Sequence, residues 1–199
     1  MYFAVIGDIM SNFAGLKSIL DRLDEEGICR VFQTGNICAA GLDPSPCVAL
    51  LRARQVICVQ GQLDKGCVKG ARQRYRTTGD GSIRVPHPVL ESAATEFLCN
   101  LPRKRMLVEE RLRILVCHGA VNSGAKILDR HTPRAILQRQ REQEPADIII
   151  SGGSAEPYAC LVDNVLFVMP GRMVSDEGGL RYTRVDTEVL PPAAQTVTL

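Results

Sequence analysis

The residues of this chain that could carry chemistry follow short apolar runs. Asp8 comes after YFAVIG, Asn36 after VFQTG, Gln62 and Asp64 after VICVQG, and His118 ends LRILVCH. Carboxylate, amide and imidazole groups bind divalent cations, and carboxylates and imidazoles also transfer protons. In α/β folds, ligand sites gather where strands end. We therefore expect these side chains to gather around one pocket.

Cationic side chains offer a second candidate chemistry. Arg172 follows the segment MPG at the end of an apolar run, and arginine binds phosphate in bidentate geometry without a metal ion. Arg172 is therefore the candidate phosphate-binding residue, and a solvated basic surface is the alternative interpretation. The segment after Gln62 adds five cations, namely Lys65, Lys69, Arg72, Arg74 and Arg76.

Three other features receive no functional role. The basic cluster Arg103-Lys104-Arg105 lacks interleaved aromatic residues, so the sequence does not predict nucleic-acid binding. His87 lies between two prolines, His131 lies two residues before Pro133, and neither matches a motif.

The elements that must position these residues are predicted from hydrophobic periodicity. Short continuous apolar runs are typical of strands covered on both faces, and Phe13, Leu16, Ile19 and Leu23 recur at helical spacing. A βα-rich half followed by a hairpin-rich half predicts a mixed sheet or two packed sheets flanked by helices. The further elements predicted are a helix in CVALLRA, helices from Pro88 to Cys99 and from Thr132 to Gln143, a hairpin around Glu109-Glu110, and strands in DIIIS, YACLV, VLFVM and LRYTRV.

The composition indicates a globular protein of one domain. Of 199 residues, 45% are hydrophobic and 23% charged, and 24 basic against 22 acidic residues leave a net charge of +2, which favours neither nucleic acid nor membrane. The N-terminus has no basic region or cleavage site, so we predict a cytoplasmic location. The eight cysteines form no CxxC pair and are predicted to be reduced, mostly buried thiols. The spacing of Cys38 and Cys117 does not support thiolate ligands.

The order of the strand-end segments resembles the calcineurin-like metallophosphoesterase superfamily, especially its small single-domain bacterial and archaeal members. The segments GDIMSN, TGNICAAGLDP, QGQLDKG, CHGA, SGGSAEPY and MPGR stand where that family has D-x-H-x-N, G-D, G-N-H-D, H-G, G-H-T-H and N-P-G-S. The resemblance implies an αββα sandwich of two mixed β-sheets flanked by helices. It covers most of the chain, so residues 1–190 are expected to form a single domain and residues 191–199 a frayed C-terminal tail.

The resemblance also implies which positions would hold the family's two metal ions. Asp8 and His118 match two ligands, Asn36 replaces the bridging carboxylate, and Gln62 stands at the asparagine ligand. Asp64 retains the last carboxylate of its motif and is interpreted as an acceptor that fixes a loop. The family's histidine positions are occupied here by Met10, Leu63, Gly153 and Ala155.

Ligand count argues against a two-metal centre, because each ion needs about three good protein ligands. Only Asp8 and His118 are unchanged, and with Asn36 and Gln62 they are at most weak candidates for a single ion. A hydrogen-bond network between strand ends is the alternative. No residue is assigned a catalytic role.

These considerations lead to three hypotheses for function. The first is a pseudoenzyme that has lost binuclear metal binding and hydrolysis, needs no cofactor, and acts as a binding or scaffold protein for a protein partner or a phosphorylated small molecule. A retromer subunit of the superfamily that serves as a scaffold is the precedent. The second is an active metal-dependent phosphatase or phosphodiesterase that uses Mn, Zn or Fe at an atypical site. The third is a structural subunit of a homo-oligomer.

Overall fold

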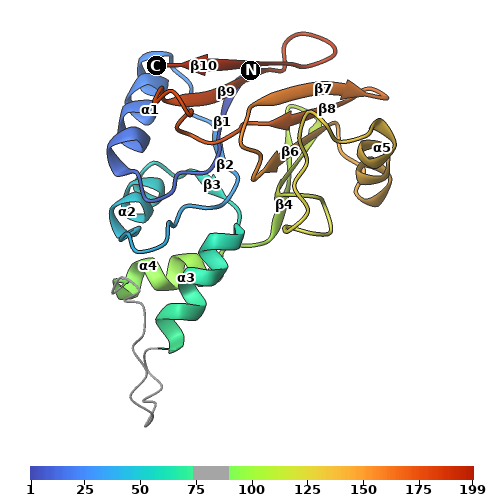
Figure 1. Cartoon of the computed structure of the whole chain (residues 1–199). Coiled ribbons are helices and arrows are strands. Elements are labelled where there is room, and N and C mark those ends of the chain that lie inside the picture. The colour runs from blue at the N-terminus through green and yellow to red at the C-terminus, as the bar shows by residue number, and fades with distance from the viewer. Residues whose placement is uncertain (74–89) are drawn as a thin grey trace.

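The fold places two five-stranded sheets face to face with helices outside them (Figure 1). The computed structural model describes residues 1–73 and 90–199. The first sheet has the order β10-β9-β1-β2-β3 and the second the order β4-β5-β6-β8-β7. Arg74, Arg76 and His87 lie outside the described residues. The first sheet consists of β1 (Tyr2–Ile6), β2 (Val31–Gln33), β3 (Ile57–Cys58), β9 (Arg181–Asp186) and β10 (Ala193–Thr198).

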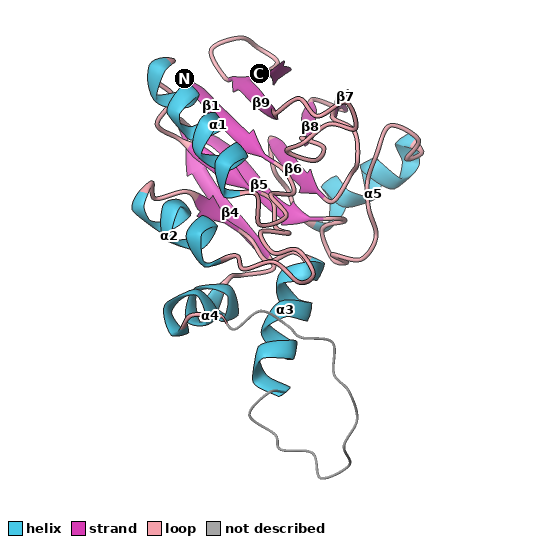
Figure 2. Ribbon diagram, turned by 60° about the vertical axis from the view of Figure 1, so that its left-hand side comes forward, coloured by secondary structure: helices cyan, strands magenta, loops and turns pink. Residues whose placement is uncertain are grey.

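Both sheets are mixed, with parallel strands in their centres. Strands β1, β2 and β3 are parallel, whereas β9 and β10 run antiparallel at one edge. In the second sheet β5, β6 and β8 are parallel, and β4 and β7 are antiparallel edge strands. The predicted sandwich of two mixed sheets is therefore confirmed (Figure 2). The second sheet consists of β4 (Lys104–Glu109), β5 (Leu112–His118), β6 (Ile148–Gly152), β7 (Tyr158–Val162) and β8 (Val165–Met169).

Three apolar layers explain why the central strands are apolar on both faces. Phe3 and Val5 of β1 pack between the sheets, where the Phe3 ring meets the Phe32 ring edge-on at 5.1 Å. The alternate residues Ala4 and Ile6 face the helices that cover the first sheet. A third layer packs the second sheet against α5. The helices are α1 (Phe13–Glu25), α2 (Ser45–Ala53), α3 (Gln62–Gln73), α4 (Ser92–Asn100) and α5 (Arg134–Gln143).

Helix α1 shows how local sequence sets an element beside the site. Asn12 accepts a hydrogen bond from the Gly15 N–H at 2.9 Å, which caps the helix directly after the loop that follows β1. Leu16, Ile19 and Leu23 are buried at helical spacing against the first sheet. The predicted helix is thus confirmed.

Several predicted elements differ from the structure. The segment from Pro191 does not fray, because Ala193–Thr198 pairs with β9 along six residues and closes that edge of the sheet. Helix α5 begins at Arg134 rather than Thr132, since Pro133 takes an extended conformation before it. The basic segment after Gln62, for which no element was predicted, is helix α3. No helix among residues 1–73 and 90–199 has the length and apolar character needed to cross a membrane.

Candidate functional site

Loops at the ends of four strands converge on one site between the sheets. Asp8 follows β1, Asn36 follows β2, and Gly61 lies between β3 and α3, while His118 ends β5 in the other sheet. The Asn36 side-chain amide donates to Asp8 Oδ2 at 2.9 Å, and the imidazole of His118 contacts the Thr34 carbonyl at 2.8 Å. The expected gathering of the strand ends is therefore what the structure shows.

Two glycines let these loops approach more closely than other residues would allow. A Cβ atom at Gly61 would lie 2.1 Å from the backbone nitrogen of Asn36, and one at Gly152 would lie 2.5 Å from the carbonyl oxygen of Thr34. Both obstacles are backbone atoms, so no side-chain movement relieves them. Gly61 joins two loops of the first sheet, and Gly152 brings β6 of the second sheet against the end of β2.

Asp64 organises the loops around the site. Its carboxylate is fully buried and accepts the backbone N–H groups of Asn36, Cys38 and Gly61 at 2.8–2.9 Å. It lies in the first turn of α3, where the helix dipole favours negative charge. Both oxygens thus hold backbone in place, which is the arrangement that a loop-fixing acceptor requires.

The orientation of the Asn36 side chain is set by its neighbours. Its Oδ1 accepts the Leu63 backbone N–H at 3.0 Å, so its Nδ2 must be the atom that faces Asp8. An amide –NH₂ group donates hydrogen bonds and has no lone pair to offer a metal ion. At the position of the family's bridging carboxylate, this chain therefore presents a donor to Asp8.

His118 has one ring nitrogen available. A carbonyl oxygen only accepts, so the 2.8 Å contact with Thr34 requires the proton on Nδ1 and leaves the lone pair on Nε2. A Cβ at Gly153 would lie 3.2 Å from this Nε2 atom and only 2.5 Å from Cδ1 of Ile127. Gly153 also has φ +84°, which side-chain-bearing residues rarely adopt. Ile127 thus lies where a side chain at position 153 would begin.

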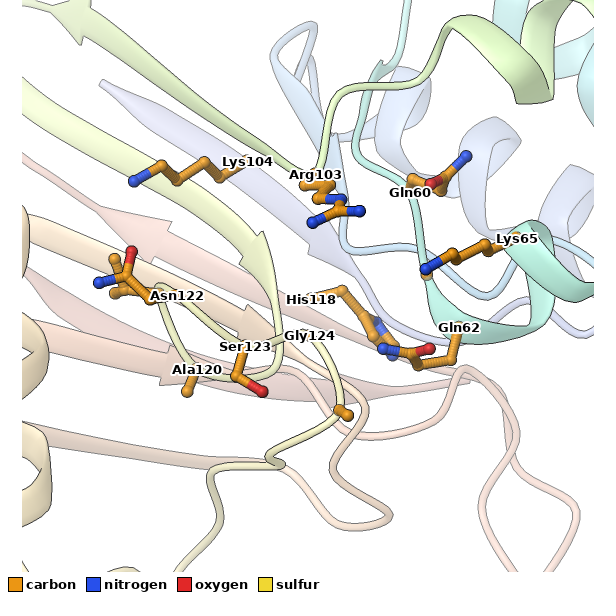
Figure 3. A pocket seen from close by; sticks show the side chains of 13 residues that line it. Gln60, Gln62, Lys65, Arg103, Lys104, His118, Ala120, Asn122, Ser123 and Gly124 are labelled. Atoms are coloured by element: carbon orange, nitrogen blue, oxygen red, sulfur yellow. The ribbon is translucent and has the colours of Figure 1, made fainter.

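The Asp8 carboxylate has an oxygen atom that could also bind a ligand. Its Oδ1 is buried and has no hydrogen-bond partner among the described residues. Burial raises the pKa of the Asp8 carboxyl, while the hydrogen bond from the Asn36 amide acts in the opposite direction. Gln62 is exposed and lies beside His118 (Figure 3).

These donors do not fit a two-metal centre. The described ranges contain no group of three or more histidine, cysteine, aspartate or glutamate side chains that could hold a metal ion. Asp8 Oδ1, His118 Nε2 and the Gln62 amide are fewer than the ligands that two ions require.

A cavity of about 420 Å³ opens beside His118. Its lining combines Gln60 and Gln62 with the cations Lys65 and Arg103. Figure 3 shows the side chains of Arg103 and Lys65 extending toward the space beside His118, whereas Lys104 extends away from it. Lys104 forms an ion pair with Glu144, so its charge is already neutralised.

Arg172 lies outside this cavity lining. Its guanidinium is exposed and lies 3.7 Å from the Asp176 carboxylate, while its backbone forms an isolated bridge with Asp8. The cation that sequence reasoning overlooked is Arg103, which it placed in an ordinary basic cluster. The helix breaker Leu101-Pro102, just before Arg103, is the sequence feature that could have indicated its position. In the structure the Pro102 carbonyl accepts the Gln60 N–H at 2.8 Å, which places Arg103 beside the strand-end loops.

The chain belongs to the calcineurin-like phosphoesterase superfamily, whose family profile matches residues 1–189. An uncharacterized protein of Methanocaldococcus jannaschii is 31% identical over 184 residues, which cover 87% of this chain and 70% of the relative. The resemblance of the motifs to this superfamily is thereby confirmed.

Solved structures share the fold at lower identity. A metallophosphoesterase from Sphaerobacter thermophilus aligns with a TM-score of 0.76 and 17% identity, over 100% of this chain and 88% of that one. Vps29 from Entamoeba histolytica, crystallised with Zn²⁺, aligns with a TM-score of 0.56 and 17% identity, over 100% of this chain and 99% of its own. At this identity the likeness concerns the fold alone.

Proposed function

We propose that this protein binds a phosphate ester through cationic side chains and does not hydrolyse it at a two-metal centre. The observation that carries this proposal is the pair of cations in the cavity beside His118. Neither Lys65 nor Arg103 forms an ion pair with another residue in the described ranges, so both charges are available to an anion. Arginine offers phosphate a bidentate fork and lysine a point charge.

The cavity has the further groups that such a ligand needs. Gln62 and Ser123 line it with an amide and a hydroxyl, which hydrogen-bond phosphate oxygens or the organic part of an ester. Gly124 lines the same cavity and leaves that wall free of a side chain, since a Cβ atom there would lie 3.0 Å from the His118 carbonyl oxygen and 3.3 Å from the Gln62 side-chain nitrogen. The volume of about 420 Å³ lies in the range of small-molecule sites.

The loss of two-metal chemistry is supported by the geometry around Asp8. The Asn36 amide supplies an N–H where a metal ion would need an oxygen, and Ile127 lies where a ligand side chain at Gly153 would extend. A neutral amide also removes the negative charge that allows two divalent cations to lie close together.

Calorimetry on chelator-treated protein tests the proposal with phenyl phosphate as the probe. We expect one site, weakened about 10- to 100-fold by Arg103→Gln, since a hydrogen bond to a charged group contributes about 1.5–3 kcal/mol. Arg105→Gln is the matched control, because Arg105 lies two residues further along, in β4, and lines a different cavity. Equal losses in the two variants, or no binding to the wild type, would refute the proposal.

The same titration separates the two arginine candidates. Arg172→Gln should leave affinity for phenyl phosphate unchanged, since its guanidinium lies beside Asp176 and outside the cavity lining. A selective loss in this variant would restore the prediction made from the sequence and refute the role of Arg103.

A second candidate function is a metal-dependent phosphoric ester hydrolase with one ion. The unpartnered Asp8 Oδ1 and the lone pair on His118 Nε2 favour it. Zn²⁺ is the first ion to test, because the similarly folded Vps29 was crystallised with it, and Mn²⁺ is the second. Tight binding and turnover that Asp8→Ala abolishes would favour this function over metal-free binding.

A further inference from the structure

The cavity beside His118 has a cationic end and a neutral end. Lys65 and Arg103 supply the charge, and both side chains extend toward the space beside the imidazole. Figure 3 shows Lys65 and Asn122 on opposite sides of His118, with Ser123 on the side of Asn122. One end of the cavity therefore suits a phosphate group, and the other faces the organic part of a phosphate ester.

A hydrogen-bonded loop forms the neutral end. The Ala120 N–H donates to the Lys126 carbonyl at 2.7 Å, the Lys126 N–H to the Ser123 carbonyl at 3.1 Å, and the Ser123 N–H to the Ala120 carbonyl at 2.9 Å. The Val121 N–H donates at 2.8 Å to Oε1 of Gln140, a buried side chain of α5. Because these bonds hold the loop through its backbone, its exposed side chains are positioned before a ligand arrives.

The polar side chains at this end have unused hydrogen-bonding groups. Asn122 and Ser123 are exposed, and within residues 1–73 and 90–199 neither side chain hydrogen-bonds another residue. An amide offers two donor hydrogens and an acceptor oxygen, and a hydroxyl both donates and accepts. Alcohol groups of a ligand also donate and accept, so they match this pair of side chains.

The same lining offers little to a flat aromatic ring. No aromatic side chain lines the cavity in the part of the chain that the structure describes, and its apolar side chains are the small ones of Ala120, Val121 and Ala125. Nucleobases and phenyl rings gain affinity by stacking on aromatic side chains. The remaining charge of the lining, Lys104, is paired with Glu144 and so does not attract a second anion to the neutral end.

We propose that the organic part of the bound phosphate ester is polyhydroxylated, as in a sugar phosphate or a cyclitol phosphate. The inference rests on the proposed binding of a phosphate ester in this cavity and adds the chemical class of that ester. The phosphate lies between Arg103 and Lys65, and ring hydroxyls bond Asn122 and Ser123. An ester without hydroxyls displaces water from these two side chains and leaves them unpaired, which is the source of selectivity.

Calorimetry with two matched esters tests the proposal. Inositol monophosphate and cyclohexyl phosphate share a six-membered carbon ring and a phosphate group, and they differ in the ring hydroxyls. We expect inositol monophosphate to bind about 10- to 100-fold more tightly, as two or three added neutral hydrogen bonds would give. A preference below about threefold, or tighter binding of cyclohexyl phosphate, would overturn the proposal.

The double variant Asn122→Ala/Ser123→Ala locates the source of the preference. Neither residue has a left-handed backbone conformation, so alanine fits both positions. The variant should reduce the preference to less than about threefold and leave the affinity for inorganic phosphate unchanged. Asn100→Ala is the matched control, because it removes an exposed amide that lines a different cavity. A full preference in the double variant would refute the roles of Asn122 and Ser123, and the wild-type comparison decides the ligand class even if this variant fails to fold.

Arg103→Gln separates failure of this inference from failure of the proposed function. Both esters carry the same phosphate group, so this variant should weaken both by the same factor. Equal wild-type affinities that both fall in Arg103→Gln would leave the proposed function standing and refute the polyhydroxylated ligand. If neither ester nor inorganic phosphate binds the wild type, both proposals fail together.

Discussion

Asp64→Asn isolates the contribution of one buried carboxylate to the architecture of the site. Asp64 is fully buried, its Oδ2 accepts the N–H groups of Asn36 and Gly61, and its Oδ1 accepts that of Cys38. An asparagine has nearly the same shape but only one acceptor oxygen. With that oxygen at the Oδ2 position, its –NH₂ group faces the Cys38 N–H, so two donors meet.

The expected cost follows from these contacts. Hydrogen bonds to a charged acceptor contribute about 1.5–3 kcal/mol and neutral ones about 0.5–1.5 kcal/mol, so the two retained bonds lose roughly 2 kcal/mol together. The Cys38 N–H left without an acceptor adds about 1–3 kcal/mol. Asp64→Asn should therefore lower the free energy of unfolding by about 3–5 kcal/mol.

Urea unfolding followed by far-ultraviolet circular dichroism measures this change, since the chain has no tryptophan for fluorescence. Asp43→Asn is the matched control. Asp43 also accepts two hydrogen bonds, both from Ser45, but it is exposed, so its loss should stay within about 0.5 kcal/mol. If Asp64→Asn costs less than about 1 kcal/mol, the argument that its charge holds the loops is refuted.

Three further predictions concern packing, pH and thiol reactivity. Gly61→Ala should lower the free energy of unfolding by more than about 3 kcal/mol, because the new Cβ atom would lie 2.1 Å from loop backbone. Gly66→Ala in α3 places its Cβ atom in open space and should raise the free energy of unfolding by about 0.5–1 kcal/mol. Urea unfolding measures both changes. Burial and a carboxylate partner raise the pKa of Tyr182 to about 12. The neutral phenol therefore stabilises the fold fully below pH 10.0, and this contribution is lost as the pH rises toward 12. The variant Tyr182→Phe should show a smaller loss of stability over that pH range. In reduced protein, a thiol reagent should label the exposed Cys29 first, while Cys117, whose pKa burial raises to about 12, should react only on unfolding.

Each of these predictions has a contrary outcome. Equal changes in the free energy of unfolding for Gly61→Ala and Gly66→Ala would show that the loops at the site move apart at little cost. If the stability of Tyr182→Phe falls above pH 10 as steeply as that of the wild type, ionisation of the Tyr182 phenol does not cause the loss. Fast labelling of Cys117 in the native state would show that β5 opens locally.

The sequence by itself determined the elements whose signals are local. Continuous apolar runs predicted β1, β5, β6 and β8, and helical spacing predicted α1, because burial on one face or on both leaves a pattern in the order of the residues. The order of the strand-end motifs was enough to indicate the superfamily. The segment Ala193–Thr198 carried no such trace, since its pairing depends on the open edge that β9 offers.

Only the tertiary structure decided how the site is built. Position 153 shows a missing histidine in the sequence, but not that Ile127 lies against the place where its side chain would begin. From the sequence, Asn36 is a possible metal ligand; in the structure its Oδ1 accepts the Leu63 N–H, so its amide presents a donor instead. From the sequence, Arg103 belongs to an ordinary basic cluster; in the structure the contact of Pro102 with Gln60 places it beside the cavity. These facts depend on which distant atoms meet, and such meetings follow from packing and hydrogen-bond geometry rather than from residue types along the chain.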